Sequence, residues 1–175
     1  MKKLLIVVDY QNDFVSGALG FEGADVIEDR IVQLIDEFEK NDDYICFTLD
    51  THGREYLKTN EGINLPTEHC IRGTWGWQLV DALQDYQMKH PRFEKQSFGS
   101  LELGNYIRGL NPLIDEVYLC GLVSNICVIS NAIIAKTALG KFGKVFVIKD
   151  ATASYDEDMQ QKCFDVLENL HIKVI

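Results

Sequence analysis

Short apolar runs alternate along the chain with segments whose apolar residues recur at helical spacing. Residues 4–8 form a continuous apolar run, which is typical of a strand buried on both faces of a parallel sheet. Between residues 26 and 38 the apolar positions recur every three or four residues, which predicts an amphipathic helix. Further strands are expected at 44–49, 92–95, 117–120, 145–148 and 172–175, and further helices at 75–84, 101–110, 125–139 and 157–170.

This alternation predicts the fold class. Strands that alternate with helices indicate a parallel sheet covered by helices on both faces, so we expect a three-layer α/β/α fold with Rossmann-like topology. The 175 residues suffice for one well-filled core and are too few for two ordinary domains. The chain contains no internal repeat, low-complexity tract or linker. We therefore expect a single domain over residues 1–175.

Composition limits the cellular compartment and the classes of binding partner that are expected for this protein. No apolar run approaches the length that a bilayer requires, and the run that opens the chain stops at Asp9 without a small-residue cleavage site. We therefore expect a cytoplasmic protein. The formal net charge is −10 and no block of basic residues occurs, which disfavours nucleic acid and anionic membranes as partners. The sequence leaves open whether the chain forms a homo-oligomer.

Five cysteines occur at irregular spacing. Because their number is odd and no Cys-x-x-Cys is present, a disulfide framework is not expected, and a reducing compartment fits. Most of them are expected to be buried, inert thiols. The cysteines are Cys46, Cys70, Cys120, Cys127 and Cys163.

Polar residues stand where the expected strands end. Asp9, Asp50 and Lys95 end three successive strands, and Cys127 follows the fourth by a short turn. Ligands of open α/β sheets bind at the carboxyl ends of the strands, so these four side chains are expected to meet. A helix start and a nearby lysine favour a cysteine thiolate, and a carboxylate in reach can move its proton. Each residue alone has an ordinary structural interpretation, and only the constellation predicts a nucleophilic site.

A second cluster lies in the loop after the second strand. Asp50 and His52 point the same way at a strand end, and His69 lies in the same loop, so the three side chains can share a divalent metal ion. The alternative is a pair of loop histidines bonded to backbone carbonyls. No glycine-rich phosphate loop is present, which disfavours a bound dinucleotide.

Together these motifs resemble the isochorismatase-like cysteine hydrolases, and among them the nicotinamidases, also called pyrazinamidases. Order and spacing agree from residue 3 to about residue 152. The matching stretches are Asp9-x-Gln11-Asn12-Asp13-Phe14, Asp50-x-His52, His69-Cys70-x-x-Gly73-Thr74-x-Gly76, Phe93-Glu94-Lys95 and Gly121-Leu122-x-x-x-x-Cys127.

The resemblance implies a six-stranded parallel sheet and a catalytic triad. Cys127 would be the nucleophile, Asp9 the general acid and base, and Lys95 the group that stabilises the thiolate. A cis peptide bond is implied between Leu122 and Val123. Backbone N–H groups of Val123 and Cys127 would then form an oxyanion hole.

The resemblance also implies a metal, usually zinc, held by Asp50, His52 and His69 and completed by water and a ring nitrogen of the substrate. Glu61 stands where some relatives supply a further carboxylate ligand. Leu65 replaces the aromatic residue that helps to stack the pyridine ring in nicotinamidases, which leaves the substrate open. The residues expected to line the substrate pocket are Phe14, Leu65, Trp75 and Tyr155, with Trp77 as a further candidate.

The expected activity is hydrolysis of a small carboxamide through a cysteine thioester, with nicotinamide giving nicotinate and ammonia. One alternative is a related cysteine hydrolase that acts on another small amide or on an N-carbamoyl or ureido compound. Isochorismatase activity itself is not expected, because it does not use the cysteine nucleophile. A further alternative is a non-catalytic doubly wound binding module, such as a flavin carrier, which leaves Asp9, Lys95 and Cys127 unexplained.

Overall fold

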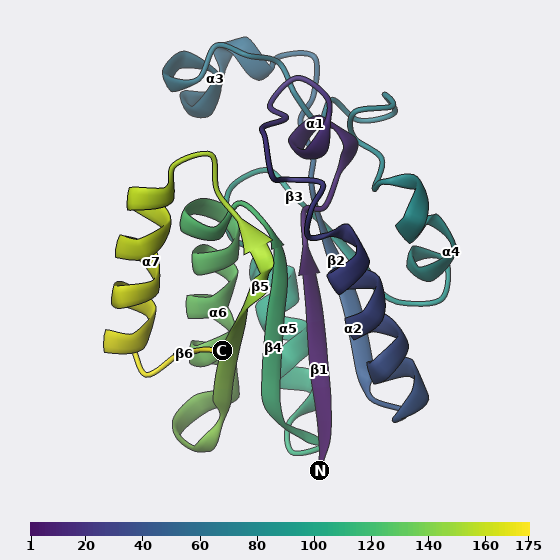
Figure 1. The fold of residues 1–175 in the computed structure, drawn as a ribbon, viewed down its shortest axis with the longest axis vertical. Helices are drawn as coiled ribbons and strands as arrows, with labels where there is room; N and C mark the ends of the chain where they lie inside the picture. The colour runs from purple at the N-terminus through teal and green to yellow at the C-terminus, as the bar shows by residue number, and fades with distance from the viewer.

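A six-stranded parallel sheet forms the centre of the protein, as the computed structural model of residues 1–175 shows (Figure 1). The strand order is β3-β2-β1-β4-β5-β6, and all five neighbouring pairs are parallel. The strands are β1 (Lys2–Val8), β2 (Tyr44–Asp50), β3 (Arg92–Lys95), β4 (Ile114–Leu122), β5 (Lys144–Ala153) and β6 (Lys173–Val174). The expected α/β fold is confirmed.

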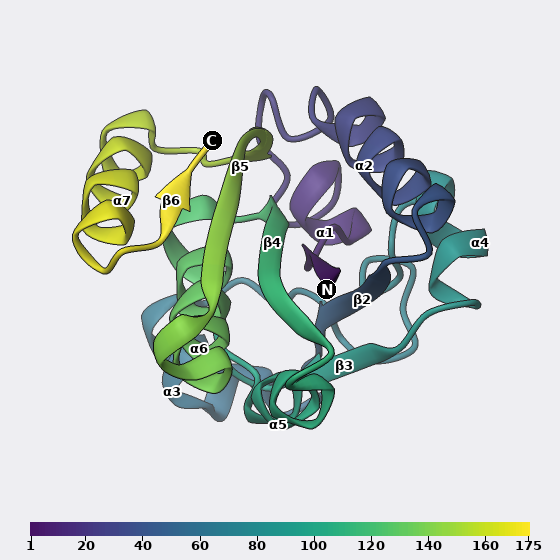
Figure 2. The same ribbon diagram turned by 90° about the horizontal axis from the view of Figure 1, so that it is seen from below.

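Helices cover both faces of this sheet (Figure 2). The helices α2 and α4 pack on one face, whereas α5, α6 and α7 pack on the other, and each face has its own cluster of buried apolar side chains. The helices are α1 (Asn12–Val15), α2 (Glu28–Lys40), α3 (Asn60–Asn64), α4 (Gln84–Gln87), α5 (Leu101–Leu110), α6 (Ile129–Leu139) and α7 (Glu157–Asn169). None of the helices has the length and apolar character that a membrane crossing requires.

Local sequence explains why the main elements form where they do. The five residues from Leu4 to Val8 are fully buried, as expected for a central strand covered on both faces. In α2 the buried residues Ile31, Leu34, Ile35 and Phe38 share one face. The side chain of Ser100 caps α5 by accepting a hydrogen bond from the Leu103 N–H, which satisfies a free donor at the helix start.

The helix expected at residues 75–84 is wrong. Helical turns begin only at Asp81; residues 75–77 form a turn, and Leu79 makes a single antiparallel bridge with Gln11 in the loop after β1. There the N–H of Asn12 donates to the Gln78 carbonyl at 2.9 Å, and the N–H of Val80 donates to the Tyr10 carbonyl at 3.2 Å. These long-range hydrogen bonds use backbone groups that a helix would pair internally, so tertiary structure overrides the local preference.

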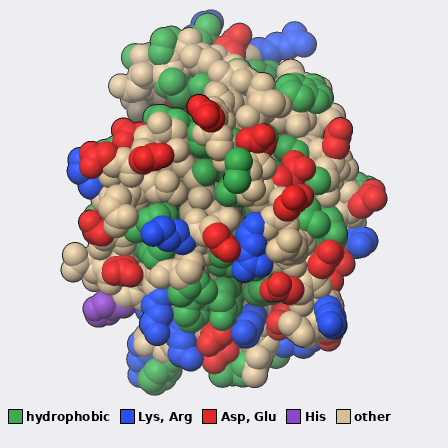
Figure 3. Space-filling model, viewed as in Figure 1, with side chains coloured by type: hydrophobic (Ala, Val, Ile, Leu, Met, Phe, Trp, Pro, Cys, Tyr) green, Lys and Arg blue, Asp and Glu red, His purple; other side chains and the backbone are tan.

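The order of the strands determines where a ligand binds. The chain proceeds from β1 outward to β2 and β3, and then crosses to β4 on the other side of β1. The switch point between β1 and β4 leaves a crevice at their carboxyl ends. In Figure 1 this is the end at which α1 and α3 lie. On the face shown in Figure 3, acidic and basic side chains are interspersed.

The close approach of β1 and β4 beneath that crevice depends on Gly121. Its φ angle is +103°, and a Cβ atom added there would overlap the carbonyl oxygen of Val8. We expect Gly121→Ala to lower the free energy of unfolding by at least about 2 kcal/mol, measured by urea denaturation. Gly109 in α5 is the control, because a Cβ atom there meets nothing within 4 Å. Gly109→Ala should instead stabilise the protein by about 0.5–1 kcal/mol. Equal stability of the two variants would show that the two strands do not need a glycine at position 121.

Candidate active site

Four buried side chains from four segments meet at the carboxyl ends of the strands. Lys95 lies at their centre: its Nζ is 2.6 Å from Asp9 Oδ2, 3.4 Å from Cys127 Sγ and 3.4 Å from Asp50 Oδ1. The four residues are between 0% and 5% exposed. The structure therefore brings together the acid, the amine and the sulfur that the sequence places at strand ends.

Strand register explains this convergence. Asp50 and Lys95 are partners across the β2–β3 pair, so their side chains leave neighbouring strands at the same level. Asp9 directly follows β1, and its N–H donates to the Thr48 carbonyl at 3.1 Å, which ties it to the end of β2. Cys127 lies in a π-helical turn, Ser124–Val128, that joins β4 to α6. Such turns occur often at functional sites because they redirect a side chain out of the regular helix.

Burial and charge determine the protonation of this cluster. Burial lowers the pKa of Lys95, but Asp9, Cys127 and Asp50 together raise it well above its ordinary value, so the amine stays an ammonium. Burial raises the pKa of Asp9 despite the attraction of Lys95. Burial also raises the pKa of Cys127 well above its ordinary value, and Lys95 only partly offsets this. One ammonium is shared with two carboxylates, so its charge offsets only part of the effect of burial on the thiol, and the thiolate that the resemblance implies stays a prediction.

The two oxygens of Asp9 have different roles. Oδ1 accepts a hydrogen bond from the Thr48 hydroxyl at 2.7 Å. Oδ2 contacts the ammonium of Lys95 but has no hydrogen bond of regular geometry. Oδ2 is therefore the oxygen that keeps a lone pair free to accept a proton.

The residue that follows β4 also brings a backbone N–H to the site. The peptide bond between Leu122 and Val123 is cis, as the resemblance predicts. The N–H of Val123 has no acceptor within the protein, and both Val123 and Cys127 line the same cavity. A free N–H beside a nucleophile is the arrangement that stabilises negative charge developing on a carbonyl oxygen.

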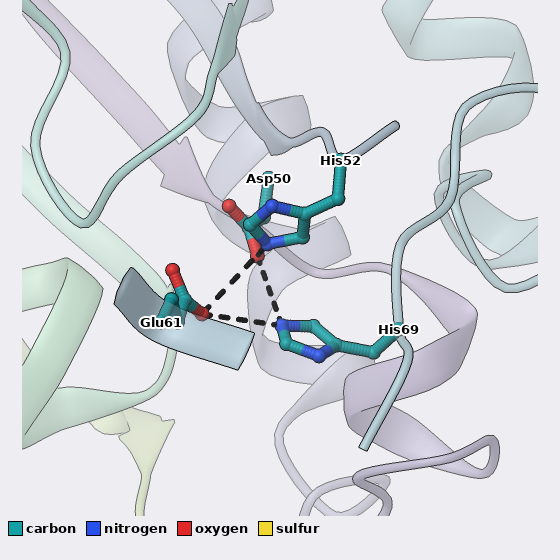
Figure 4. A group of neighbouring side chains, drawn as sticks. All are labelled: Asp50, His52, Glu61 and His69. Atoms are coloured by element: carbon teal, nitrogen blue, oxygen red, sulfur yellow. Dashed lines mark hydrogen bonds and ion pairs between the residues drawn. The ribbon is translucent and has the colours of Figure 1, made fainter. Parts of the chain in front are cut away.

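Beside this cluster, Asp50 meets three further residues in a second group of ligand atoms (Figure 4). His52 Nε2 and His69 Nε2 lie 3.0 Å and 3.3 Å from Asp50 Oδ2. The same two nitrogens lie 3.7 Å and 3.5 Å from Glu61 Oε1. Ligand atoms that surround a zinc ion tetrahedrally at about 2.1 Å lie about 3.4 Å apart, so these four atoms fit a divalent cation. Glu61 thus belongs with the three expected ligands in space.

The surroundings of this group also suit a cation. His69 Nδ1 lies 2.8 Å from the Thr67 carbonyl, and such a contact orients the ring so that Nε2 faces the other ligand atoms. Burial lowers the pKa of His69, but hydrogen bonds with Asp50 and Glu61 outweigh this and raise it to about 10. Burial raises the pKa of Asp50, yet Lys95, His52 and His69 together hold it well below its ordinary value. The group therefore attracts positive charge strongly.

A cavity of about 430 Å³ opens over Cys127, and it is called the Cys127 cavity below. Among the expected pocket residues, Phe14, Leu65 and Tyr155 line it. Trp75 does not, because it is 57% exposed and lies outside the cavity. Trp77 is also outside, and its indole N–H donates to the Thr51 hydroxyl at 2.8 Å.

Five apolar residues of the Cys127 cavity were not predicted from the sequence, namely Ala18, Leu19, Phe21, Phe98 and Ile126. Phe21 follows α1 and contacts Tyr155 edge to face with ring centroids 6.0 Å apart. Phe98 lies three residues after Lys95, and Ile126 directly precedes Cys127. The short distance in sequence from two proposed catalytic residues was the available signal for Phe98 and Ile126. Phe21 carried no such signal. Cys127 and Val123 line this apolar cavity, whereas Asp9 does not line it and is linked to the Cys127 sulfur through Lys95. A sulfur, a carboxylate and a free N–H beside an apolar cavity suit acyl transfer to a small substrate.

Comparisons with known proteins agree with this geometry. The isochorismatase domain profile matches residues 3–175. The uncharacterized isochorismatase family protein PncA of Bacillus subtilis is 34% identical over 172 residues, with 90% of each chain covered. The nicotinamidase of Saccharomyces cerevisiae is 26% identical over 217 residues, with 99% of each chain covered. The crystal structure of nicotinamidase/pyrazinamidase PncA from Bacillus subtilis matches with a TM-score of 0.86 at 30% identity, covering 99% of both chains.

The hydrogen bond from Thr48 to Asp9 can be tested by its effect on stability. We expect Thr48→Val to lower the free energy of unfolding by about 1–3 kcal/mol, because a buried carboxylate oxygen loses its donor while the side-chain shape is kept. Thr48→Ser keeps the hydroxyl and should be more stable than Thr48→Val in urea denaturation. A Thr48→Val protein as stable as the unsubstituted one would show that Oδ1 does not need this donor.

Proposed function

Because the chain belongs to the isochorismatase family of hydrolases, we propose that it converts nicotinamide to nicotinate and ammonia through a thioester on Cys127. Its similarity to nicotinamidases makes the chain a hydrolase that acts on amide bonds. The observation that carries the finer proposal is the position of Lys95, whose ammonium contacts both the Asp9 carboxylate and the sulfur of Cys127, a residue that lines an apolar cavity.

In the first half of the proposed reaction, the sulfur of Cys127 attacks the carboxamide carbon. Asp9 Oδ2 accepts the thiol proton as the carbon–sulfur bond forms, and the Val123 N–H donates to the carbonyl oxygen as it becomes negative. The carbon–nitrogen bond then breaks. Asp9 returns its proton to the leaving nitrogen, so ammonia departs and a thioester remains. The fixed ammonium of Lys95 offsets the negative charge of this step.

In the second half, water replaces ammonia. Asp9, again a carboxylate, accepts a proton from water while the water oxygen attacks the thioester carbon. The carbon–sulfur bond breaks, and the proton held by Asp9 passes to the sulfur. Nicotinic acid leaves, and the thiol and the carboxylate are restored. The raised pKa of Cys127 supports this scheme, because the thiol regains its proton at the end of each cycle.

Asp50, His52, Glu61 and His69 would hold a divalent cation at the edge of the Cys127 cavity. We propose zinc, because two imidazole nitrogens and two carboxylates are a donor set that zinc accepts. A zinc ion held by these four residues would supply a Lewis acid for a ring nitrogen of the substrate. The cavity walls orient the ring, since Asp50 and His69 line the same cavity as Cys127.

A related hydrolase for another small amide or an N-carbamoyl compound is the remaining alternative. The apolar lining of the Cys127 cavity favours an aromatic ring over a ureido group, which carries many hydrogen-bonding atoms. The flavin-type binding module is set aside, because family membership makes the chain a hydrolase.

Replacement of the nucleophile tests the proposal. We expect Cys127→Ala to lower ammonia release from nicotinamide by at least about 10³-fold, because no thioester can form without the sulfur. Asp9→Asn should have an effect of similar size, since an amide oxygen cannot act as the proton acceptor. Both variants are checked for folding by circular dichroism.

The matched control is Cys46→Ala, which removes another buried thiol outside the cavity. It should retain activity within about twofold and lose only about 1 kcal/mol of stability. Ammonia release by Cys127→Ala at the rate of the unsubstituted enzyme would overturn the mechanism.

The metal proposal predicts one zinc ion per chain in the purified protein. Added zinc should raise the melting temperature of the metal-stripped protein. At a free zinc concentration one hundred times its Kd, the free energy of unfolding should rise by about 2.7 kcal/mol. Glu61→Gln should weaken zinc binding by at least about tenfold, whereas Glu55→Gln, a nearby acid outside the ligand group, should leave it unchanged. Failure of the unsubstituted protein to bind zinc would contradict the proposal.

A further inference from the structure

A second cavity adjoins the Cys127 cavity. It measures about 600 Å³ and is called the second cavity below. The residues that line both cavities are Glu61, Leu65, Phe98, Ile126 and Tyr155. A ring seated over Cys127 therefore faces the second cavity across a shared wall. Binding pockets for whole small molecules span roughly 300–1,000 Å³, so the Cys127 cavity alone accommodates a one-ring amide and the second cavity is additional space.

The two cavities differ sharply in polarity. Ten of the 14 residues that line the Cys127 cavity are hydrophobic, but only four of the 14 around the second cavity are. Asn60 of α3 lies on its wall with Gln96 and Ser97, which follow β3. The side chains of these three residues form no hydrogen bond within the protein; Asn60 uses only its backbone carbonyl, which accepts from Asn64. They are free to bind a polar group of a ligand.

The charge of the second cavity has one sign. Glu61 and His52 on its wall belong to the proposed zinc site, which leaves Glu55 as the one carboxylate outside that site, and no lysine or arginine lines the cavity. Glu55 forms no ion pair with any residue of the chain, so its charge is not neutralised locally. A carboxylate or phosphate placed beside Glu55 would be repelled by it, and no lysine or arginine side chain lines the cavity to bind such a group.

We propose that the substrates of this enzyme include carboxamides whose ring carries a polar arm, uncharged or positively charged, that lies in the second cavity. The amide occupies the Cys127 cavity. The arm extends past the residues that line both cavities and reaches Asn60, Gln96 and Glu55 in the second cavity. An anionic arm is rejected. This inference rests on the proposed hydrolysis at Cys127 for the position of the amide, and it names the substrate class that the site accepts.

The test measures binding, so that it does not depend on turnover. Nicotinamides with ring arms of equal length ending in a hydroxyl, an ammonium or a carboxylate are titrated by calorimetry into the zinc-loaded Cys127→Ala protein. The hydroxyl and ammonium compounds should bind at least about threefold more tightly than the carboxylate compound. Glu55→Gln should reduce the ratio between the ammonium and carboxylate affinities by up to about fivefold, the range of an exposed ion pair. Asn60→Ala should weaken binding of the hydroxyl compound.

The control is Glu102→Gln, which removes an acid in the first turn of α5 that does not line the second cavity. It should leave all three affinities unchanged. Equal affinities of the three compounds, or a ratio unaffected by Glu55→Gln, would overturn the inference. Failure of the proposed function has a separate signature, namely no release of ammonia from nicotinamide by the unsubstituted enzyme.

Discussion

The site depends on one buried ammonium that is shared among three acceptors. Lys95 Nζ contacts the Asp9 carboxylate, the Asp50 carboxylate of the proposed metal-ligand group, and the sulfur of Cys127, the proposed nucleophile. Buried charges are tolerated only when they are paired, so removing any one member leaves the others unbalanced. Because β3 ends at Lys95 and pairs with the end of β2, the sheet holds this cation at a fixed position.

Asp50 links the buried charge of Lys95 to the proposed metal ligands His52, Glu61 and His69. Its Oδ1 faces Lys95, and its Oδ2 faces His52 and His69. One carboxylate therefore joins the charge balance of the nucleophile to that of the proposed zinc site. Gln11 holds the backbone of Asp50 in place: its side chain donates to the Asp50 carbonyl and accepts from the Asp50 N–H, both at 2.8 Å. The family motif around Asp9 thus also supports the metal-ligand group.

Much of the fold and of the candidate site could be predicted from the local pattern of apolar and polar residues. The expected strand at 92–95 and helix at 101–110 match the structure, and residues at strand ends converge because parallel strands share one carboxyl edge. What failed depended on contacts between distant segments. Residues 75–80 pair with the loop after β1, which also places Trp75 outside the cavity that Phe21 and Phe98 line. The pKa of Cys127 depends on its burial and on how many carboxylates share Lys95, and spacing in sequence reveals neither.

The central claim is that Cys127 carries the acyl group during turnover. The most direct measurement is rapid acid quenching of the enzyme with nicotinamide, followed by mass spectrometry of its peptides. The account predicts a nicotinoyl adduct on the peptide that contains Cys127, formed at a rate that equals or exceeds steady-state turnover. Sustained ammonia release with no adduct on that peptide at any quench time would contradict it.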